Sequence, residues 1–136
     1  MVARTIVPGL VMLLAAGCIS IKGNVVDADT AQAEENVFRH VVLFKYKDTA
    51  TPENIKAVED AFLDLKNKID VIKDIETGSN VSTENLSHGF TDCFIVTFAD
   101  SAGRDAYLPS PEHQAFVKFA GPYLAEALVI DFKPRK

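Results

Sequence analysis

The strongest constraint on the fold is a stretch from Phe38 to Tyr46 that carries apolar side chains on both faces of a predicted strand. Val42 and Phe44 alternate with Val41 and Leu43, so each pair lies on its own face. A sheet with one face in water has no need of apolar side chains on that face. We therefore expect both faces to be covered, one by helices and the other by a second sheet.

The chain after residue 50 predicts further helices and strands. Thr51 is a suitable N-cap for a helix with Pro52 at its first position, and apolar residues then recur every three or four residues as far as Ile69. Later helices are predicted at Ala102–Leu108 and Pro111–Phe119. Further strands are predicted at Val71–Thr77, Phe90–Phe98 and Ala127–Phe132, with a polar loop at Gly78–Gly89. The order βαββαβ predicts an α+β domain of the ferredoxin-like type.

The N-terminal part predicts export and a lipid anchor. Arg4 precedes an apolar run, residues 6–16, that is typical of a signal peptide and too short to span a bilayer. The run ends in Ala15-Ala16-Gly17-Cys18, which resembles a bacterial lipobox, in which the cysteine receives diacylglycerol. We expect a signal peptide at 1–17, a lipidated Cys18 with a disordered tether at 18–36, and a domain at 37–133. An ordinary signal peptide, cut at a nearby small residue, is the alternative.

This organisation predicts an exported bacterial lipoprotein that is held at a membrane, in the periplasm or on the cell surface. The formal charge of −5 disfavours nucleic acid as a partner, because phosphates are bound by clustered cations. Cys93 lies within a predicted strand, far from Cys18, so we expect no internal disulfide and treat Cys93 as a small buried apolar residue.

Four segments carry a resemblance to a known family. They are HVVLFK at 40–45, GFT at 89–91, YLPSPEHQAFV at 107–117 and LVIDF at 128–132. From Val37 to Phe132 the sequence resembles the stress-responsive A/B barrel domain (Dabb) family of the dimeric α/β-barrel superfamily.

The resemblance implies a homodimer, in which two four-stranded sheets pack face to face as an eight-stranded barrel. This arrangement would cover the second apolar face, to which Val41, Leu43, Cys93 and Ile95 belong. It also implies a pocket between the sheet and the helices of each subunit. The expected pocket residues are His40, Val42, Phe44, Phe62, Phe94, Val96 and Tyr107.

Catalytic residues are also implied by the resemblance. Plant polyketide cyclases of the family use a tyrosine and a histidine that fall on Tyr107 and His113, and His40 would polarise the same pocket. A neutral histidine suits proton abstraction next to a carbonyl, and a tyrosine can stabilise the enolate oxygen. Two residues depart from this pattern: Ser110 replaces a histidine that is frequent in the family, and Asp92 stands where the plant cyclase has another histidine. The alternative is that His113 and His40 only form local hydrogen bonds.

Our first interpretation is a homodimeric, membrane-anchored, stress-responsive domain that binds a small, mostly apolar molecule or serves a stress-related role, without known catalysis. The alternative is an enzyme of the polyketide-cyclase or monooxygenase type that uses His113 and Tyr107. A narrow pocket around these two side chains favours the enzyme, and a core filled by side chains favours binding or structural roles. We expect no cofactor, and no metal, because His40, His88 and His113 lack metal-ligand spacing.

Overall fold

The structure, a computed structural model, describes residues 37–135, so the predicted signal peptide, Cys18 and the tether lie outside the described residues. The strands are β1 (Phe38–Tyr46), β2 (Ile72–Ser79), β3 (Asp92–Phe98) and β4 (Leu124–Phe132). The helices are α2 (Pro52–Leu63), α3 (Leu65–Lys68), α4 (Ser101–Tyr107) and α5 (Pro111–Ala120). Their order along the chain is the predicted βαββαβ, with each helical region made of two pieces.

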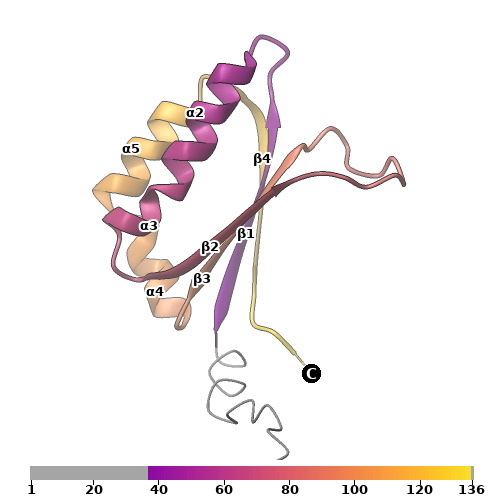
Figure 1. The fold of residues 1–136 in the computed structure, drawn as a ribbon. Helices are drawn as coiled ribbons and strands as arrows, with labels where there is room; N and C mark the ends of the chain where they lie inside the picture. The colour runs from indigo at the N-terminus through magenta and orange to yellow at the C-terminus, as the bar shows by residue number, and fades with distance from the viewer. Residues whose placement is uncertain (1–36, 136) are drawn as a thin grey trace, which may run out of the picture.

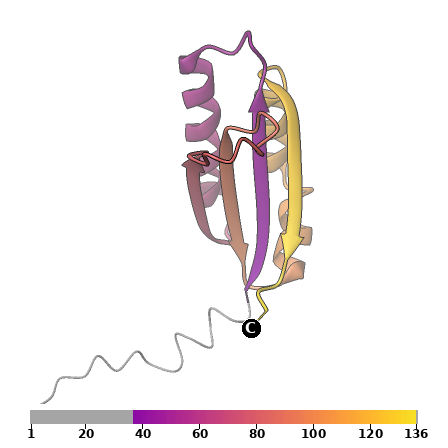
Figure 2. The ribbon, with the colours of Figure 1, turned by 90° about the vertical axis from the view of Figure 1, so that its right-hand side faces the viewer.

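The strands form one antiparallel sheet in the order β2-β3-β1-β4. Within residues 37–135, all helices lie on one side of this sheet and none lies on the other face (Figures 1 and 2). Layers of this kind, with two βαβ crossovers, define the ferredoxin-like fold. The predicted α+β class is therefore confirmed.

Helix α2 begins where the sequence predicts it. The Thr51 hydroxyl accepts from the Asn54 backbone N–H at 3.3 Å, and the Asn54 side chain accepts from the Thr51 N–H at 3.1 Å. This capping box satisfies backbone donors that the first helical turn leaves free, and Pro52 starts the helix with its fixed φ. The predicted continuous helix as far as Ile69 is interrupted at Asp64, but Leu65 and Ile69 on either side of α3 still reach the core.

Four strand boundaries differ from the predictions, the smallest difference being the start of β2 at Ile72 instead of Val71. β2 continues to Ser79, because Gly78 and Ser79 pair with β3. β3 starts at Asp92 rather than Phe90, whose N–H instead bonds to the Ser87 carbonyl in a turn. β4 starts at Leu124, three residues before the predicted Ala127, because a register shift between Lys45 and Tyr46 lets its first residue pair with Tyr46. A bulge of this kind is invisible to an alternation pattern.

The core lies between the inner face of the sheet and the helices, and aromatic rings fill its centre. Phe62 of α2 stacks on Phe94 of β3 with a centroid distance of 4.2 Å, and meets Phe116 of α5 edge to face at 5.1 Å. Phe44 of β1 lies 5.1 Å from Phe94. Burial and ring geometry both favour this cluster, so it joins the two helices to the sheet.

The outer face of the sheet is apolar, and residues 37–135 leave it uncovered. Val41 pairs with Ile130 and Leu43 with Leu128, and directly paired residues share a face. Ile130 is 52% exposed and Leu128 40%. The alternation predicted for β1 is confirmed: one set of side chains meets the helices, while the other set lies on the uncovered face.

Phe62→Ala is expected to lower the free energy of unfolding by about 3–5 kcal/mol, because it leaves a cavity between both helices and the sheet. The adjacent Leu63 is 37% exposed, and Leu63→Ala should cost about 1 kcal/mol or less. Urea unfolding followed by circular dichroism measures both. Equal losses in the two variants would contradict the placement of the core.

Candidate functional site

A pocket of about 340 Å³ lies on the inner face of the sheet, between β1, β4 and helices α4 and α5. Most of its wall is apolar and comes from β1, β4 and one side of α5. The lining residues are His40, Val42, Phe44, Phe62, Tyr107, Leu108, His113, Phe116, Val117, Ala120, Gly121, Leu124, Ala127, Val129 and Asp131.

Three rings form the polar end of this pocket. Tyr107, the last residue of α4, is 1% exposed, and its ring lies 4.3 Å from that of His113 and 5.7 Å from that of His40. Tyr107 thus stands between a histidine of α5 and a histidine of β1. The three residues come together because α4 and α5 are joined by a short turn above the first strand.

His40 is oriented by a carboxylate. Its Nδ1 lies 2.7 Å from Oδ1 of Asp131, which faces it in the β1–β4 register. An ionised carboxylate only accepts hydrogen bonds, so Nδ1 carries the proton and Nε2 of neutral His40 holds a lone pair. Arg104 of α4 donates to the other Asp131 oxygen, and its guanidinium lies 5.1 Å from the centre of the Phe38 ring. Arg104 therefore fixes the carboxylate that fixes the histidine.

His113 is oriented by the backbone. Its Nδ1 donates to the Leu108 carbonyl at 2.9 Å, and since a carbonyl cannot donate, Nε2 of neutral His113 is again an acceptor. Burial lowers the pKa of His113, and the hydrogen bond to Leu108 opposes only part of that shift. His113 is consequently neutral at pH 7 and able to take a proton.

Tyr107 supplies the donor. Burial raises the pKa of its hydroxyl well above the ordinary value, so the group stays protonated at neutral pH. Tyr107 is among the residues that line the pocket. The polar end thus offers the O–H donor of Tyr107 and the imidazole acceptor of His113 to a molecule in the pocket.

Ser110 holds Tyr107 and His113 together. Its hydroxyl donates to the Tyr107 carbonyl at 2.8 Å and accepts from the His113 backbone N–H at 3.3 Å. Ser110 is the N-cap of α5, with Pro111 at the first position. The serine that departs from the family pattern therefore acts as a helix cap.

The structure brings most of the predicted site residues together. His40, Tyr107 and His113 meet at one end, and the walls include the predicted Val42, Phe44 and Phe62. Phe94 and Val96 are not pocket residues: both are fully buried in the core, because β3 lies on the side of β1 away from the pocket.

Sequence reasoning missed the contribution of β4. Val129 and Asp131 line the pocket, together with Leu124 and Ala127. A signal was present, since Asp131 is a carboxylate inside an apolar strand, on the same face as Val129. Recognising it required the register that places Asp131 opposite His40.

Asp92 lies outside this pocket. It is 6% exposed at the start of β3, where the hydroxyls of Thr91 and Ser79 donate to it at 2.7 and 3.2 Å. Burial and the nearby Asp92 raise the pKa of Glu59 on α2. In the described part of the chain, no group of three or more His, Cys, Asp or Glu side chains is arranged to hold a metal ion.

Comparison with known proteins identifies the family. The model of the stress responsive A/B barrel domain matches residues 38–134. The stress-response A/B barrel domain-containing protein HS1 of Arabidopsis thaliana is 35% identical over 96 residues, which cover 71% of this chain and 88% of that protein. Olivetolic acid cyclase of Cannabis sativa is 28% identical over 98 residues, covering 72% of this chain and 97% of the cyclase.

Solved structures agree with this assignment. The crystal structure of At3g17210 from Arabidopsis thaliana superposes with a TM-score of 0.70 at 34% identity, covering 73% of this chain and 96% of that one. A protein from Bacteroides fragilis, described as dimeric and ferredoxin-like, gives a TM-score of 0.59 at 25% identity, covering 73% and 97%. The chain belongs to the stress-responsive A/B barrel domain (Dabb) family.

Proposed function

We propose that the domain binds a small, largely apolar molecule with a polar end, in the pocket of His40, Tyr107 and His113. The observation that carries this proposal is an open volume of about 340 Å³ with mostly apolar walls, where a filled core would leave no space. Ligand sites commonly have such walls and a few convergent polar groups.

The chemistry of the polar end specifies the ligand further. The Tyr107 hydroxyl can donate and Nε2 of neutral His113 can accept, while Nδ1 of His40 is engaged by Asp131. A hydroxyl group satisfies both requirements, because it accepts from Tyr107 and donates to a histidine. A carbonyl satisfies the first alone.

Proton transfer next to a carbonyl is the second candidate function. It is favoured by the two oriented histidines, whose Nδ1 atoms are engaged so that Nε2 can take a proton, with the neutral Tyr107 hydroxyl beside them. Similarity to olivetolic acid cyclase supports this candidate. The binding step is common to both functions.

The proposed assembly is a homodimer that covers the outer face of the sheet. Its support is the uncovered apolar row that includes Val41, Leu43 and Ile130, and the dimeric state described for the Bacteroides fragilis relative. Sheets pack face to face when both inner faces are apolar.

Export and lipidation at Cys18 remain proposals that rest on the sequence of residues 1–36. Among residues 37–135, no helix has both the length and the apolar content to cross a bilayer. A lipid on Cys18 would hold the domain at the membrane by a tether, at the surface where apolar molecules concentrate.

A pair of probes that differ by one hydroxyl tests the binding proposal. Tyr107→Phe is expected to weaken the binding of 2-naphthol about 3- to 10-fold, because 2-naphthol can accept a hydrogen bond from Tyr107. The affinity for naphthalene, which cannot accept this bond, should not change. Val129→Asp should weaken both probes, because it places a charge in the apolar wall. Fluorescence titration at pH 7.5 gives the affinities. If both probes bind and neither variant changes their affinities, the binding site lies elsewhere.

The pH dependence of 2-naphthol binding should follow His113. Because burial lowers the pKa of His113 below its usual 6.5, the acceptor stays neutral at pH 7 and is lost only on the acid side. Affinity should therefore be level from pH 7 to 8 and fall below about pH 6. The same titrations in His113→Gln, which cannot be protonated in this range, serve as the control.

Hydrogen exchange at a ketone tests the second candidate. Wild-type protein in D₂O should accelerate deuterium exchange beside the carbonyl of 4-phenyl-2-butanone, and His113→Ala should reduce the enzymatic rate by about 10²–10⁴ without loss of the fold. Proton NMR follows the exchange, and a melting curve accompanies each variant. Exchange no faster than in buffer alone would remove this candidate while leaving the binding proposal standing.

Membrane attachment is tested with the two cysteines. Cys18→Ser should move the protein from the membrane to the soluble fraction, since acyl chains supply about 0.8 kcal/mol per buried CH₂. Cys93→Ser is the matched control and should fractionate like wild type. An unmodified Cys18 by mass spectrometry, with no change in fractionation, would reject the anchor.

A further inference from the structure

We propose that the end of the domain where β1 begins and β4 ends docks on an anionic phospholipid surface, through the cations of the C-terminal tail, residues 133–135. This docking rests on the proposed lipid anchor at Cys18 and is independent of the ligand proposed for the pocket. It gives the anchored domain an orientation, because one end of the sheet faces the bilayer.

The chain enters and leaves the domain at the same end. Arg39, the second residue of β1, pairs with Phe132, the last residue of β4, so the tail begins beside the start of β1. Figures 1 and 2 show the C-terminal end of the described chain close to that start. An anchor within residues 1–36 therefore holds the domain by the end that carries the tail.

The tail is cationic although the chain as a whole is acidic. Its sequence begins the run KPRK at 133–136, in a chain of formal net charge −5. Lys133 and Arg135 are both exposed, and neither forms an ion pair with a carboxylate of residues 37–135. Exposed cations beside a membrane anchor attract anionic headgroups, and each raises the binding constant about 5-fold.

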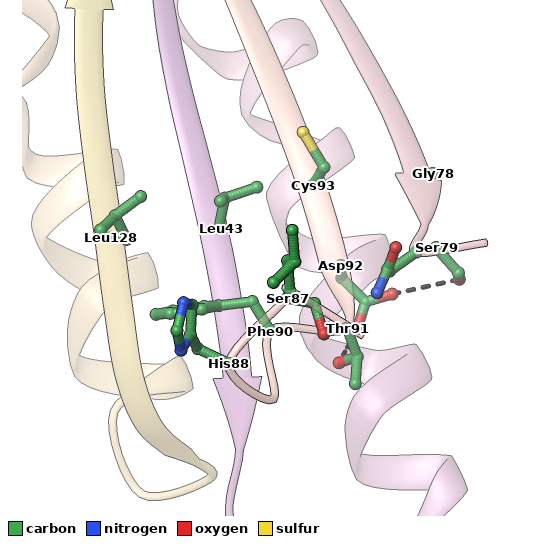
Figure 3. Close-up of a pocket in the computed structure, with 12 residues that line it drawn as sticks. Leu43, Gly78, Ser79, Ser87, His88, Phe90, Thr91, Asp92, Cys93 and Leu128 are labelled. Atoms are coloured by element: carbon green, nitrogen blue, oxygen red, sulfur yellow. Dashed lines mark hydrogen bonds between the residues drawn. The ribbon is translucent and has the colours of Figure 1, made fainter. Parts of the chain in front are cut away.

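Carboxylates mark the opposite end of the sheet. Asp92 begins β3, where the hydroxyls of Ser79 and Thr91 donate to it (Figure 3). Glu53 lies in the first turn of α2 at the same end. A hydrogen bond from its own backbone N–H, and one from Thr51, hold the pKa of Glu53 below its usual value. An anionic surface repels this end while it attracts the tail, so the charges favour a single orientation.

The anchor makes a short cationic tail sufficient. The predicted tether, residues 19–36, would have a root-mean-square length of about 25 Å as a flexible coil. The tail is then held near the headgroups at a high local concentration. A few cations that would bind a vesicle weakly on their own are thus enough to orient a domain that the anchor already holds.

The orientation has a consequence for the pocket. His40 follows Arg39 on β1, and Asp131 precedes Phe132 on β4, so the polar end of the pocket lies near the docked end. A molecule that carries one polar group places that group at the depth of the headgroups. Docking by the tail would therefore bring the polar end of the pocket close to the polar group of such a molecule.

Acetylation of lysines in the lipidated full chain tests the docking. The protein is reconstituted in vesicles of phosphatidylethanolamine with phosphatidylglycerol, or of phosphatidylcholine alone, and peptide mass spectrometry gives the rate at each lysine. Lys133 should react at least about 5-fold more slowly in the anionic vesicles. Sodium chloride at about 0.5 M should remove the difference, because salt screens exposed charges. Lys56 on α2, whose side chain is 72% exposed, is the internal control and should react equally in both.

Two variants with the same change of charge separate docking from net charge. Arg135→Gln keeps Lys133 as the reporter, and its rates in the two kinds of vesicle should differ by no more than about 2-fold. Lys118→Gln, on the exposed side of α5, is the matched control and should leave the protection of Lys133 intact.

Equal rates at Lys133 in both kinds of vesicle would overturn the docking and leave the anchor and the pocket standing. Equal protection in micelles of a neutral detergent would also overturn it, because the acidic Glu34 and Glu35 or another protein surface would then cover the tail. The same mass spectra report the lipid on Cys18. A protein without that lipid would overturn the anchor and the docking together.

Discussion

The antiparallel pairing of β1 with β3 on one side and β4 on the other is the constraint on which the rest of the structure depends. It places Val42 and Phe44 under the helices and turns Val41 and Leu43 to the bare face. A slip of one residue would exchange these faces and bring charge into the core. The same register sets His40 opposite Asp131, so the pairing that builds the core also builds the polar end of the pocket.

The second requirement of the site is the turn between α4 and α5. Tyr107 ends one helix, and His113 lies in the first turn of the next, with Ser110 bonded to both backbones. The side chains at the polar end of the pocket are thus held at the ends of regular elements, whose geometry is fixed by packing against the sheet. Helix capping, commonly a matter of stability alone, here also sets the distance between a phenol and an imidazole.

The sequence predicts a great deal of this fold, because alternation and helical spacing report which side chains share a face. Alternation along β1 places His40 on the same face as Val42 and Phe44, and the Dabb resemblance adds Tyr107 and His113 to the predicted pocket. Alternation along a strand shows which face a side chain lies on, but not how deeply it is buried or which strands adjoin it. Phe94 and Val96 are therefore predicted to line the pocket, although β3 lies on the side of β1 away from the pocket. The roles of Asp131 and Arg104, and the shape of loop 80–91, depend on register and backbone conformation, which no local pattern encodes.

The position of β4 at the edge of the sheet has a consequence for exchange of ligand with solvent. Within the described chain β4 is bonded to β1 alone, while it supplies Val129 and Asp131 to the pocket. An edge strand opens locally at a lower free-energy cost than a central one. Fraying of β4 would open one wall while the aromatic core beneath Phe62 stays closed. The rate at which a molecule would leave the proposed binding pocket then depends on the local opening of β4, which hydrogen exchange of the β4 amides measures.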